Sequence, residues 1–168
     1  MLTFVYPTES NREDVLSFYA EFEAEGTACI GCAGYQDYDK WLTGIHNRIT
    51  GTDLPEGFVQ EAFYLCYDGD EVVGVLNLKF TLTPFLLNYG GHVGYAVRPS
   101  RQNHGLATQM MRQCMDIARG MGMEKLLLVC DDDNYASEKV ILRSGAVYED
   151  TRYDPEEAVN VKRFWVTL

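Results

Sequence analysis

The stretch that decides the fold is VRPSRQNHGLAT, which spans residues 97–108. It follows a strand pattern over residues 91–97, which Pro99 ends, and it leads into the clearest helical pattern of the chain, residues 105–121. The first N–H groups of a helix lack intrahelical acceptors, and the helix dipole adds positive potential there. The turn that contains Gly105 therefore predicts a phosphate-binding site. The glycine has no side chain, so a phosphate group can approach the backbone there.

The charge distribution around this turn agrees with an anionic ligand. The chain has 14 basic and 25 acidic residues, which gives a net charge of −11. Between residues 98 and 120 the only acid is Asp116, and the basic residues are Arg98, Arg101, Arg112 and Arg119. A cationic segment in an acidic protein is what an anionic cofactor requires, although an ordinary strand–loop–helix with solvated arginines has the same pattern.

The overall composition excludes several classes of partner. An acidic surface repels phosphodiester backbones and anionic lipids, so we expect no nucleic acid and no membrane among the partners. No apolar run approaches the roughly 18 residues of a spanning helix, and residues 1–7 do not resemble a signal peptide. Cys66, Cys114 and Cys130 lie within apolar segments, which indicates reduced core thiols and a cytoplasmic protein.

Hydrophobic periodicity and turn residues predict one mixed α/β domain over residues 1–168. The expected order is βααβββαβαββ, a mostly antiparallel central sheet flanked by about four helices, with one strand–helix–strand crossover. The predicted strands span residues 2–6, 62–67, 71–81, 91–97, 126–130, 146–152 and 163–168. The first predicted helix follows a cap at Thr8 or Ser10 and runs to about residue 24, and the other predicted helices span residues 38–49, 105–121 and 134–144. The uninterrupted apolar run at 126–130 indicates a strand that is covered on both faces.

Other ligand motifs are absent or weak. The chain has neither G-x-x-x-x-G-K-[ST] nor G-x-G-x-x-G, which excludes a Walker-type NTPase and the dinucleotide fingerprint. It also lacks the G-x-S-x-G of serine hydrolases. Cys29 and Cys32 form a lone C-x-x-C without a second ligand pair, so we expect no metal site. The run at residues 131–133 is Asp-Asp-Asp, and we expect it to cap the helix that follows rather than to bind a metal.

The hexapeptide QNHGLA, residues 102–107, is similar to the [QR]-x-x-G-x-[GA] signature of the GNAT acetyltransferases. The strand before it, and the later helix with Asn134 and Ser137, also resemble that family. The resemblance covers the element order of the whole chain and is sharpest from residue 91 to 146. It implies a GNAT-like fold and an acetyl-CoA-dependent N-acetyltransferase, which acts on a primary amine of a small molecule or peptide.

The resemblance also implies where the cosubstrate acetyl-CoA binds, without any metal. Val97 would hydrogen-bond the pantetheine or the thioester through its backbone, and Asn134 and Ser137 would flank the cofactor. The diphosphate would be held by the backbone amides of Gln102, Asn103, His104, Gly105, Leu106, Ala107 and Thr108.

The implied reaction needs a base. An alkylamine with a pKa of about 10.4 is mostly protonated at neutral pH, and only its neutral form attacks a thioester. His92 lies on the strand that enters the phosphate turn, where many relatives carry a glutamate that acts directly or through water. A histidine suits proton removal near pH 7. His92 is therefore the candidate base, with a purely structural histidine at a strand end as an equal alternative.

The general acid is left open by the sequence. Relatives often carry a tyrosine seven residues after the counterpart of Asn134, as the acid that protonates the leaving thiolate, but Ile141 stands at that position. Tyr95, Tyr135 and Tyr148 are nearby in sequence, and none occupies that place. A thiolate with a pKa of about 8.5 leaves with modest help. Because no nucleophile–base arrangement is recognisable, we expect direct transfer in a ternary complex.

The first two predicted helices and their loops are acidic, and in the family this region borders the acceptor pocket. The acids are Glu9, Glu13, Asp14, Glu21, Glu23, Glu25, Asp37, Asp39, Asp53 and Glu56. We therefore expect a cationic acceptor, although a solvated acidic helix explains the same residues. A homodimer is a further expectation from the family. The alternatives to an enzyme are a non-catalytic acyl-CoA-binding or sensing module and a nucleotide-binding regulator.

Overall fold

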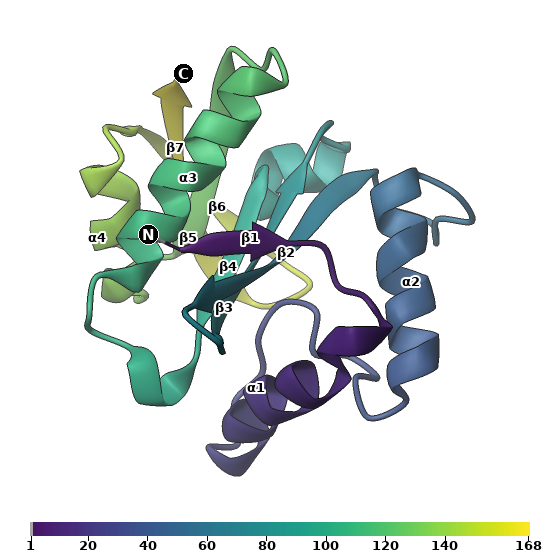
Figure 1. Cartoon of the computed structure of the whole chain (residues 1–168). Helices are drawn as coiled ribbons and strands as arrows, with labels where there is room; N and C mark the ends of the chain where they lie inside the picture. The colour runs from purple at the N-terminus through teal and green to yellow at the C-terminus, as the bar shows by residue number, and fades with distance from the viewer. Residues whose placement is uncertain (1) are drawn as a thin grey trace.

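The structure is a computed structural model that describes residues 2–168, and its strands and α-helices follow one another in the predicted order (Figure 1). The strands are β1 (Thr3–Val5), β2 (Glu61–Asp68), β3 (Glu71–Lys79), β4 (Val93–Val97), β5 (Lys125–Asp131), β6 (Val147–Asp154) and β7 (Val159–Thr167). The α-helices are α1 (Arg12–Ala24), α2 (Tyr38–Thr50), α3 (Leu106–Gly120) and α4 (Tyr135–Arg143). The predicted mixed α/β fold with mostly antiparallel strands is confirmed.

The strands form two antiparallel sheets, whereas the sequence predicts one central sheet. The first has the order β1-β2-β3-β4 and the second the order β5-β7-β6, and no ladder pairs β4 with β5 among residues 2–168. Two hydrogen bonds of 2.8 Å join the sheets at His92, whose N–H donates to the carbonyl oxygen of Leu127 and whose Nδ1 accepts from the N–H of Leu127. Beyond this junction the facing edges of β4 and β5 lack a strand partner, so their main-chain groups are available to a ligand.

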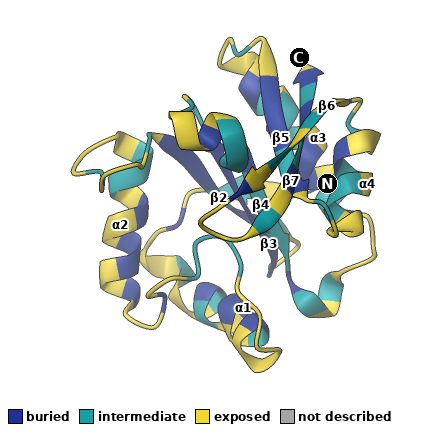
Figure 2. Cartoon of the chain, turned by 180° about the vertical axis from the view of Figure 1, so that it is seen from behind, coloured by how far each residue is buried: buried dark blue, intermediate teal, exposed yellow. Residues whose placement is uncertain are grey.

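Apolar side chains on the two faces of the first sheet pack into two cores. On one face α1 and α2 bury Phe18 and Trp41 against Phe63 of β2. On the other face α3 and α4 bury Met110 and Ile141, together with residues of both sheets. Successive residues of a strand point to opposite faces, which explains why one sheet feeds both cores. Figure 2 shows buried residues along the inner strands and exposed residues on the outer sides of α1 and α2.

Two local predictions about buried segments are confirmed. The apolar run of β5 is buried on both faces, because Leu126, Leu127 and Leu128 are each at most 1% exposed. The three cysteines predicted to be core thiols are also buried, and they are Cys66, Cys114 and Cys130.

The connection between β3 and β4, where the sequence predicts a loop over residues 84–91, contains a π-helical turn at Leu86–Gly90. The turn is held by Arg163 of β7, which is 2% exposed. Its Nε donates to the carbonyl oxygen of Leu87 at 3.0 Å, and its Nη1 pairs with Asp150 at 2.7 Å. Such turns often mark functional sites, and this one brings Tyr89 to the gap between the two sheets.

Candidate active site

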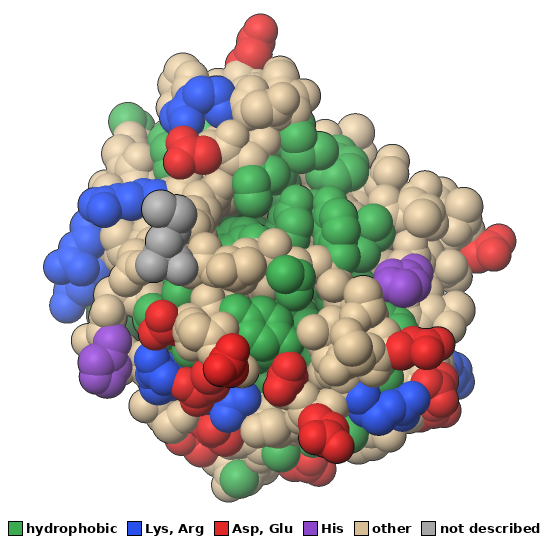
Figure 3. Space-filling view, viewed as in Figure 1, with side chains coloured by type: hydrophobic (Ala, Val, Ile, Leu, Met, Phe, Trp, Pro, Cys, Tyr) green, Lys and Arg blue, Asp and Glu red, His purple; other side chains and the backbone are tan. Residues whose placement is uncertain are grey.

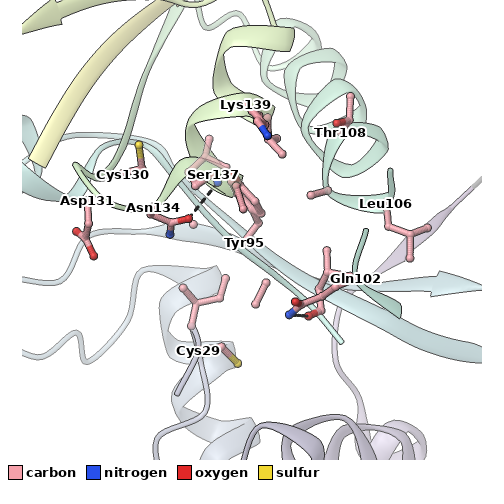
Figure 4. Close-up of a pocket in the computed structure, with 18 of the residues that line it drawn as sticks. Cys29, Tyr95, Gln102, Leu106, Thr108, Cys130, Asp131, Asn134, Ser137 and Lys139 are labelled. Carbon is pink, nitrogen blue, oxygen red and sulfur yellow. Dashed lines mark hydrogen bonds between the residues drawn. The ribbon is translucent and has the colours of Figure 1, made fainter. Parts of the chain in front are cut away.

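A cavity of about 760 Å³ lies between the two sheets, which is within the size range of small-molecule sites. One wall is β4 from Val93 to Val97, and the opposite wall is the end of β5 from Val129 to Asp131. The start of α3 and the inner side of α4 complete it, and Cys29 reaches it from the connection between α1 and α2 (Figure 4). The cavity therefore follows the edges of β4 and β5 that no strand covers.

The structure brings the predicted cofactor residues together, with one exception. His104 does not line the cavity, and its Nδ1 lies 2.7 Å from the carbonyl oxygen of Gln102 inside the loop. The sequence motif fixes only the backbone of this turn, so it could not predict where the imidazole points. The predicted residues that line the cavity are Val97, Gln102, Asn103, Gly105, Leu106, Ala107, Thr108, Asn134 and Ser137.

The turn before α3 has the geometry of a phosphate cradle. Gly105 is the N-cap of α3 with a φ of 77°, and Asn103 has a φ of 64°, so the chain enters the left-handed region twice. No side chain in the described part of the chain caps α3, so the N–H groups of Leu106, Ala107 and Thr108 keep their donor capacity. A Cβ added at Gly105 would meet no atom within 4 Å, so the backbone conformation, not crowding, requires glycine.

The predicted cationic segment is largely neutralised in the structure. Arg98 is 7% exposed, and its Nη1 pairs with Glu21 of α1 at 2.7 Å. Arg101 lines the cavity, but it pairs with Asp68 at 2.9 Å and also with Glu71. The two arginines therefore anchor the turn to α1 and to the β2–β3 hairpin. The prediction that the arginines form a free anion-binding segment is wrong for Arg98.

Positive charge reaches the cavity from α4 instead, which the sequence reading missed. Lys139 and Arg143 both line the cavity. They are four residues apart and so lie on the same face of the helix. This spacing, read on the helix that follows Asn134, is the signal that could have identified them.

The N-terminus of α4 is capped by Asn134, whose Oδ1 accepts the N–H of Ser137 at 3.0 Å (Figure 4). The preceding aspartate run was expected to supply the cap, and that prediction is wrong because Asn134 occupies the capping position. Asp132 instead accepts from the side chain of Asn160 at 3.1 Å. Asp131 lines the cavity, and its pKa is raised by burial and by its acidic neighbours.

The connection between α1 and α2 is held firmly against the cavity. The carbonyl oxygen of Ile30 accepts from the hydroxyl of Tyr19 at 3.1 Å. The carbonyl oxygen of Gly31, the next residue, accepts from Nε1 of Trp41 at 2.6 Å. Cys29 and Ile30 therefore form part of the cavity wall, and two buried aromatic residues hold them there.

The acidic residues of α1 and α2 do not line the cavity. Figure 3 shows acidic side chains gathered on the outer surface over α1, which is the lower part of that view. Two of them have basic partners, because Glu21 pairs with Arg98 and Asp39 pairs with Arg12 at 2.5 Å. The carboxylate that does line the cavity is Asp131. The carboxylate in the cavity wall is therefore on β5, not on the first two helices, where the acidic residues were expected to border the acceptor pocket.

His92 sits at the junction of the two sheets and not in the cavity wall. It is 8% exposed, and its ring packs edge-on against Trp165 with 6.2 Å between ring centroids. Burial lowers the pKa of His92 to about 4, so the ring is neutral at pH 7 but weakly basic. This geometry favours the structural alternative, and the role of His92 as a base stays a prediction.

Tyr95, which sequence spacing does not assign to a site, lines the cavity. It lies on β4, and its hydroxyl is 2.8 Å from Oγ of Ser137 on α4. Ile141, which stands where relatives often have a tyrosine, is 1% exposed and packs in the core. The position of Tyr95 could not be inferred from spacing, because it depends on how far β4 and α4 are separated.

The fold and the cavity define the class of protein: a mixed α/β domain with an anion cradle at the mouth of a gap between two sheets. The sequence model of the acetyltransferase (GNAT) family matches residues 35–146. The chain belongs to this family, and it is an acetyltransferase that uses acetyl-CoA as the donor. A search of curated proteins by sequence finds no match.

Solved structures of acetyltransferases share the fold at low sequence identity. An acetyltransferase from Salmonella typhimurium, which modifies the N-terminal serine of ribosomal protein L7/L12, has a TM-score of 0.74 at 19% identity, with 99% of this chain and 95% of that chain covered. The microcin C7 self-immunity acetyltransferase MccE, in complex with acetyl-CoA and AMP, has a TM-score of 0.75 at 13% identity, covering 99% and 92%. The ribosomal-protein-S5-alanine acetyltransferase from Vibrio fischeri has a TM-score of 0.72 at 13% identity, covering 99% and 92%.

Two further features concern metals and membranes. Within residues 2–168, no group of three or more His, Cys, Asp or Glu side chains is placed to hold a metal ion. In the same part of the chain, every helix is too short or too polar to cross a bilayer.

Proposed function

We propose that this protein is an N-acetyltransferase that moves the acetyl group of acetyl-CoA to a primary amine by direct attack in a ternary complex. The observation that carries the proposal is one continuous cavity with a main-chain anion cradle at α3 and a carboxylate, Asp131, in its β5 wall. The cradle suits a diphosphate and the carboxylate suits a protonated amine, so both substrates can occupy the cavity together.

The cavity fits coenzyme A at several points along its length. Leu106, Ala107 and Thr108 line the cavity at the uncapped start of α3, so their N–H groups are available to a diphosphate. Lys139 and Arg143 add positive charge for phosphate groups from α4. The edge of β4 that no strand covers offers main-chain partners to the amide groups of the pantetheine arm.

Direct attack is supported by the state of the cysteines. Cys29 and Cys130 line the cavity and are the thiols that could carry a covalent acetyl group. Burial raises the pKa of Cys29 to about 12 and that of Cys130 to about 11. Both thiols are therefore protonated at neutral pH, and a protonated thiol is a poor nucleophile.

A cationic acceptor is supported by Asp131. Among the described residues that line the cavity, Asp131 is the one acid, and two further acids follow it at residues 132 and 133. A carboxylate in this place attracts an ammonium group and disfavours an anionic acceptor. The relatives that acetylate the N-terminus of a ribosomal protein make a peptide α-amine one reasonable class of acceptor, beside small amines.

The test is a panel of cationic, neutral and anionic amines, assayed by release of the CoA thiol. Turnover is expected for cationic amines, and the Asp131→Asn variant should raise their KM by about fivefold, as expected for a partly exposed charge pair. The matched control is Asp133→Asn, which removes the same charge from a position outside the cavity wall. Turnover of neutral or anionic amines alone, or an equal effect of both variants, would contradict the cationic acceptor.

A further inference from the structure

Breaking the thioester leaves an electron pair on the sulfur of coenzyme A, and a proton donor beside that sulfur assists its departure. Ile141 cannot be the donor, because it is buried in the core and carries no proton to give. The cavity must therefore supply the proton from elsewhere. Tyr95 and Ser137 both line the cavity, and the hydroxyl of Tyr95 is 2.8 Å from that of Ser137.

Tyr95 is placed between the two parts of the cavity that the substrates would occupy. In Figure 4 its ring lies between Gln102 and Leu106 on one side and Cys29 and Asp131 on the other. The first pair belongs to the diphosphate cradle, and the second pair marks the acceptor side. The bond that breaks must lie between these two ends, because the thioester joins the CoA arm to the acetyl group that the amine attacks.

We propose that Tyr95 is the general acid of this enzyme and that Ser137 restores its proton; this rests on the proposed function. The amine nitrogen forms the new C–N bond, and the tetrahedral intermediate collapses with cleavage of the C–S bond. The electron pair of that bond goes to sulfur, which takes the phenolic proton of Tyr95. Tyr95 then recovers a proton from water through the hydroxyl of Ser137, while the proton of the amine leaves to solvent.

The protonation state of Tyr95 suits this role. Burial raises the pKa of Tyr95 and outweighs the opposing effect of the hydrogen bond to Ser137, so the phenol carries its proton at neutral pH. The bond to Ser137 also fixes the direction of the hydroxyl across the gap between β4 and α4. Sequence spacing does not reveal this pair, because its members are 42 residues apart.

The test compares two donors with the full-length Tyr95→Phe variant. With acetyl-CoA, kcat should fall by about 100-fold, the lower range of general acid catalysis, while the affinity for CoA measured by calorimetry stays unchanged. With the acetyl thioester of 4-nitrothiophenol, whose thiolate leaves without a proton, the variant should stay within about threefold of the wild type. Ser137→Ala should reduce kcat with acetyl-CoA less than Tyr95→Phe does.

The matched control is Tyr64→Phe, which removes another hydroxyl that pairs with a hydroxyl, that of Tyr6 at 3.3 Å, outside the cavity wall. It should leave both donors unaffected. An unchanged kcat in Tyr95→Phe, or an equal loss with both donors, would overturn the assignment, since the second result indicates a structural role. Slow hydrolysis of acetyl-CoA, with water as the acceptor, separates the two proposals. If no amine increases the rate of thiol release by the wild type, the proposed function fails. The rate of hydrolysis in Tyr95→Phe, compared with the wild type, still tests the role of Tyr95. No release from the wild type under any condition would overturn both.

Discussion

The two ends of the cavity are built in different ways. The cradle end consists of main-chain groups from one continuous segment, residues 102–108, at the start of α3. The rest of the cavity, which includes the side that we propose for the acceptor, consists of side chains from separate parts of the chain, among them Cys29, Tyr95, Asp131 and Ser137. A site made of main-chain groups depends on backbone conformation and tolerates many side chains. A site made of side chains from several elements depends on those side chains and on how the elements are positioned. Substitutions at the two ends should therefore have different signatures.

The largest effect is expected at the cradle. Gly105→Val places a β-branched residue at a φ of 77°, which forces the turn out of its conformation and disperses the N–H groups of the cradle. The affinity for coenzyme A, measured by calorimetry, should fall by about 100-fold, or about 2.7 kcal/mol.

The control for this prediction is Gly57→Val. Gly57 has a φ of 83°, and a Cβ there would also meet no atom within 4 Å, but it does not line the cavity. It should lower stability by a similar amount and leave the affinity for coenzyme A unchanged. If the wild type and Gly105→Val bind coenzyme A with equal affinity, the turn before α3 does not bind the diphosphate, and the proposed function loses its main support.

A smaller effect is expected where the two sheets meet. His92→Ala leaves the buried N–H of Leu127 without its acceptor, so the free energy of unfolding should fall by about 2 kcal/mol. His92→Asn offers an amide oxygen as many bonds from the backbone as Nδ1, so it should keep most of the stability. It should also keep kcat, because the ring does not line the cavity. A 100-fold loss of kcat in a stable His92→Asn protein would instead show that His92 is the base.

The same residue makes a pH prediction. Burial holds the pKa of His92 near 4 in the folded protein, below its ordinary value of 6.5. Between pH 6.5 and 4 the unfolded chain therefore binds more protons than the folded protein does. The contribution of the neutral His92 to the free energy of unfolding is fully present above pH 6.5 and is lost as the pH decreases through this range. In His92→Asn this acid-dependent loss should shrink by on the order of 2 kcal/mol at pH 4, as measured by denaturant unfolding at several pH values. An identical pH dependence of both proteins would contradict the burial argument.

The difference between the two ends also explains what the sequence could predict. The cradle is readable because a strand, Pro99, Gly105 and an amphipathic helix follow one another within a short segment. The element order is readable for the same reason, since each strand and helix has its own periodicity. Asp131 and Lys139 were not assigned to the site, because a residue that is charged and close to a helix start has many ordinary roles.

The split between the two sheets is the feature that local patterns could not predict. The sequence shows that residues 93–97 and 125–131 are strands, but nothing in either strand says that they lack a common ladder. The sheets are joined by one main-chain hydrogen bond, from the N–H of His92 to the carbonyl oxygen of Leu127, and by one side-chain hydrogen bond, in which Nδ1 of His92 replaces a backbone acceptor for the N–H of Leu127. Because a histidine at a strand end can accept such a hydrogen bond or act as a base, the sequence left both interpretations of His92 open. The position of Tyr95 could not be derived either, because it depends on how the two sheets are separated.

The smallest expected effect is at Asn134, whose side chain both caps the main chain of α4 and lines the cavity. Its Oδ1 caps α4 through the N–H of Ser137, and its Nδ2 has no acceptor in the described part of the chain, while the residue lines the cavity. Asn134→Ala should lower the free energy of unfolding by about 1 kcal/mol, because a helix loses its cap. Asn134→Ser keeps a capping oxygen but loses Nδ2, so it should restore stability and leave the KM for acetyl-CoA raised by about threefold, the value of one modest hydrogen bond. If serine restores the KM as well, Asn134 only caps α4, and the cofactor contacts on this side come from the main chain, as they do at the cradle.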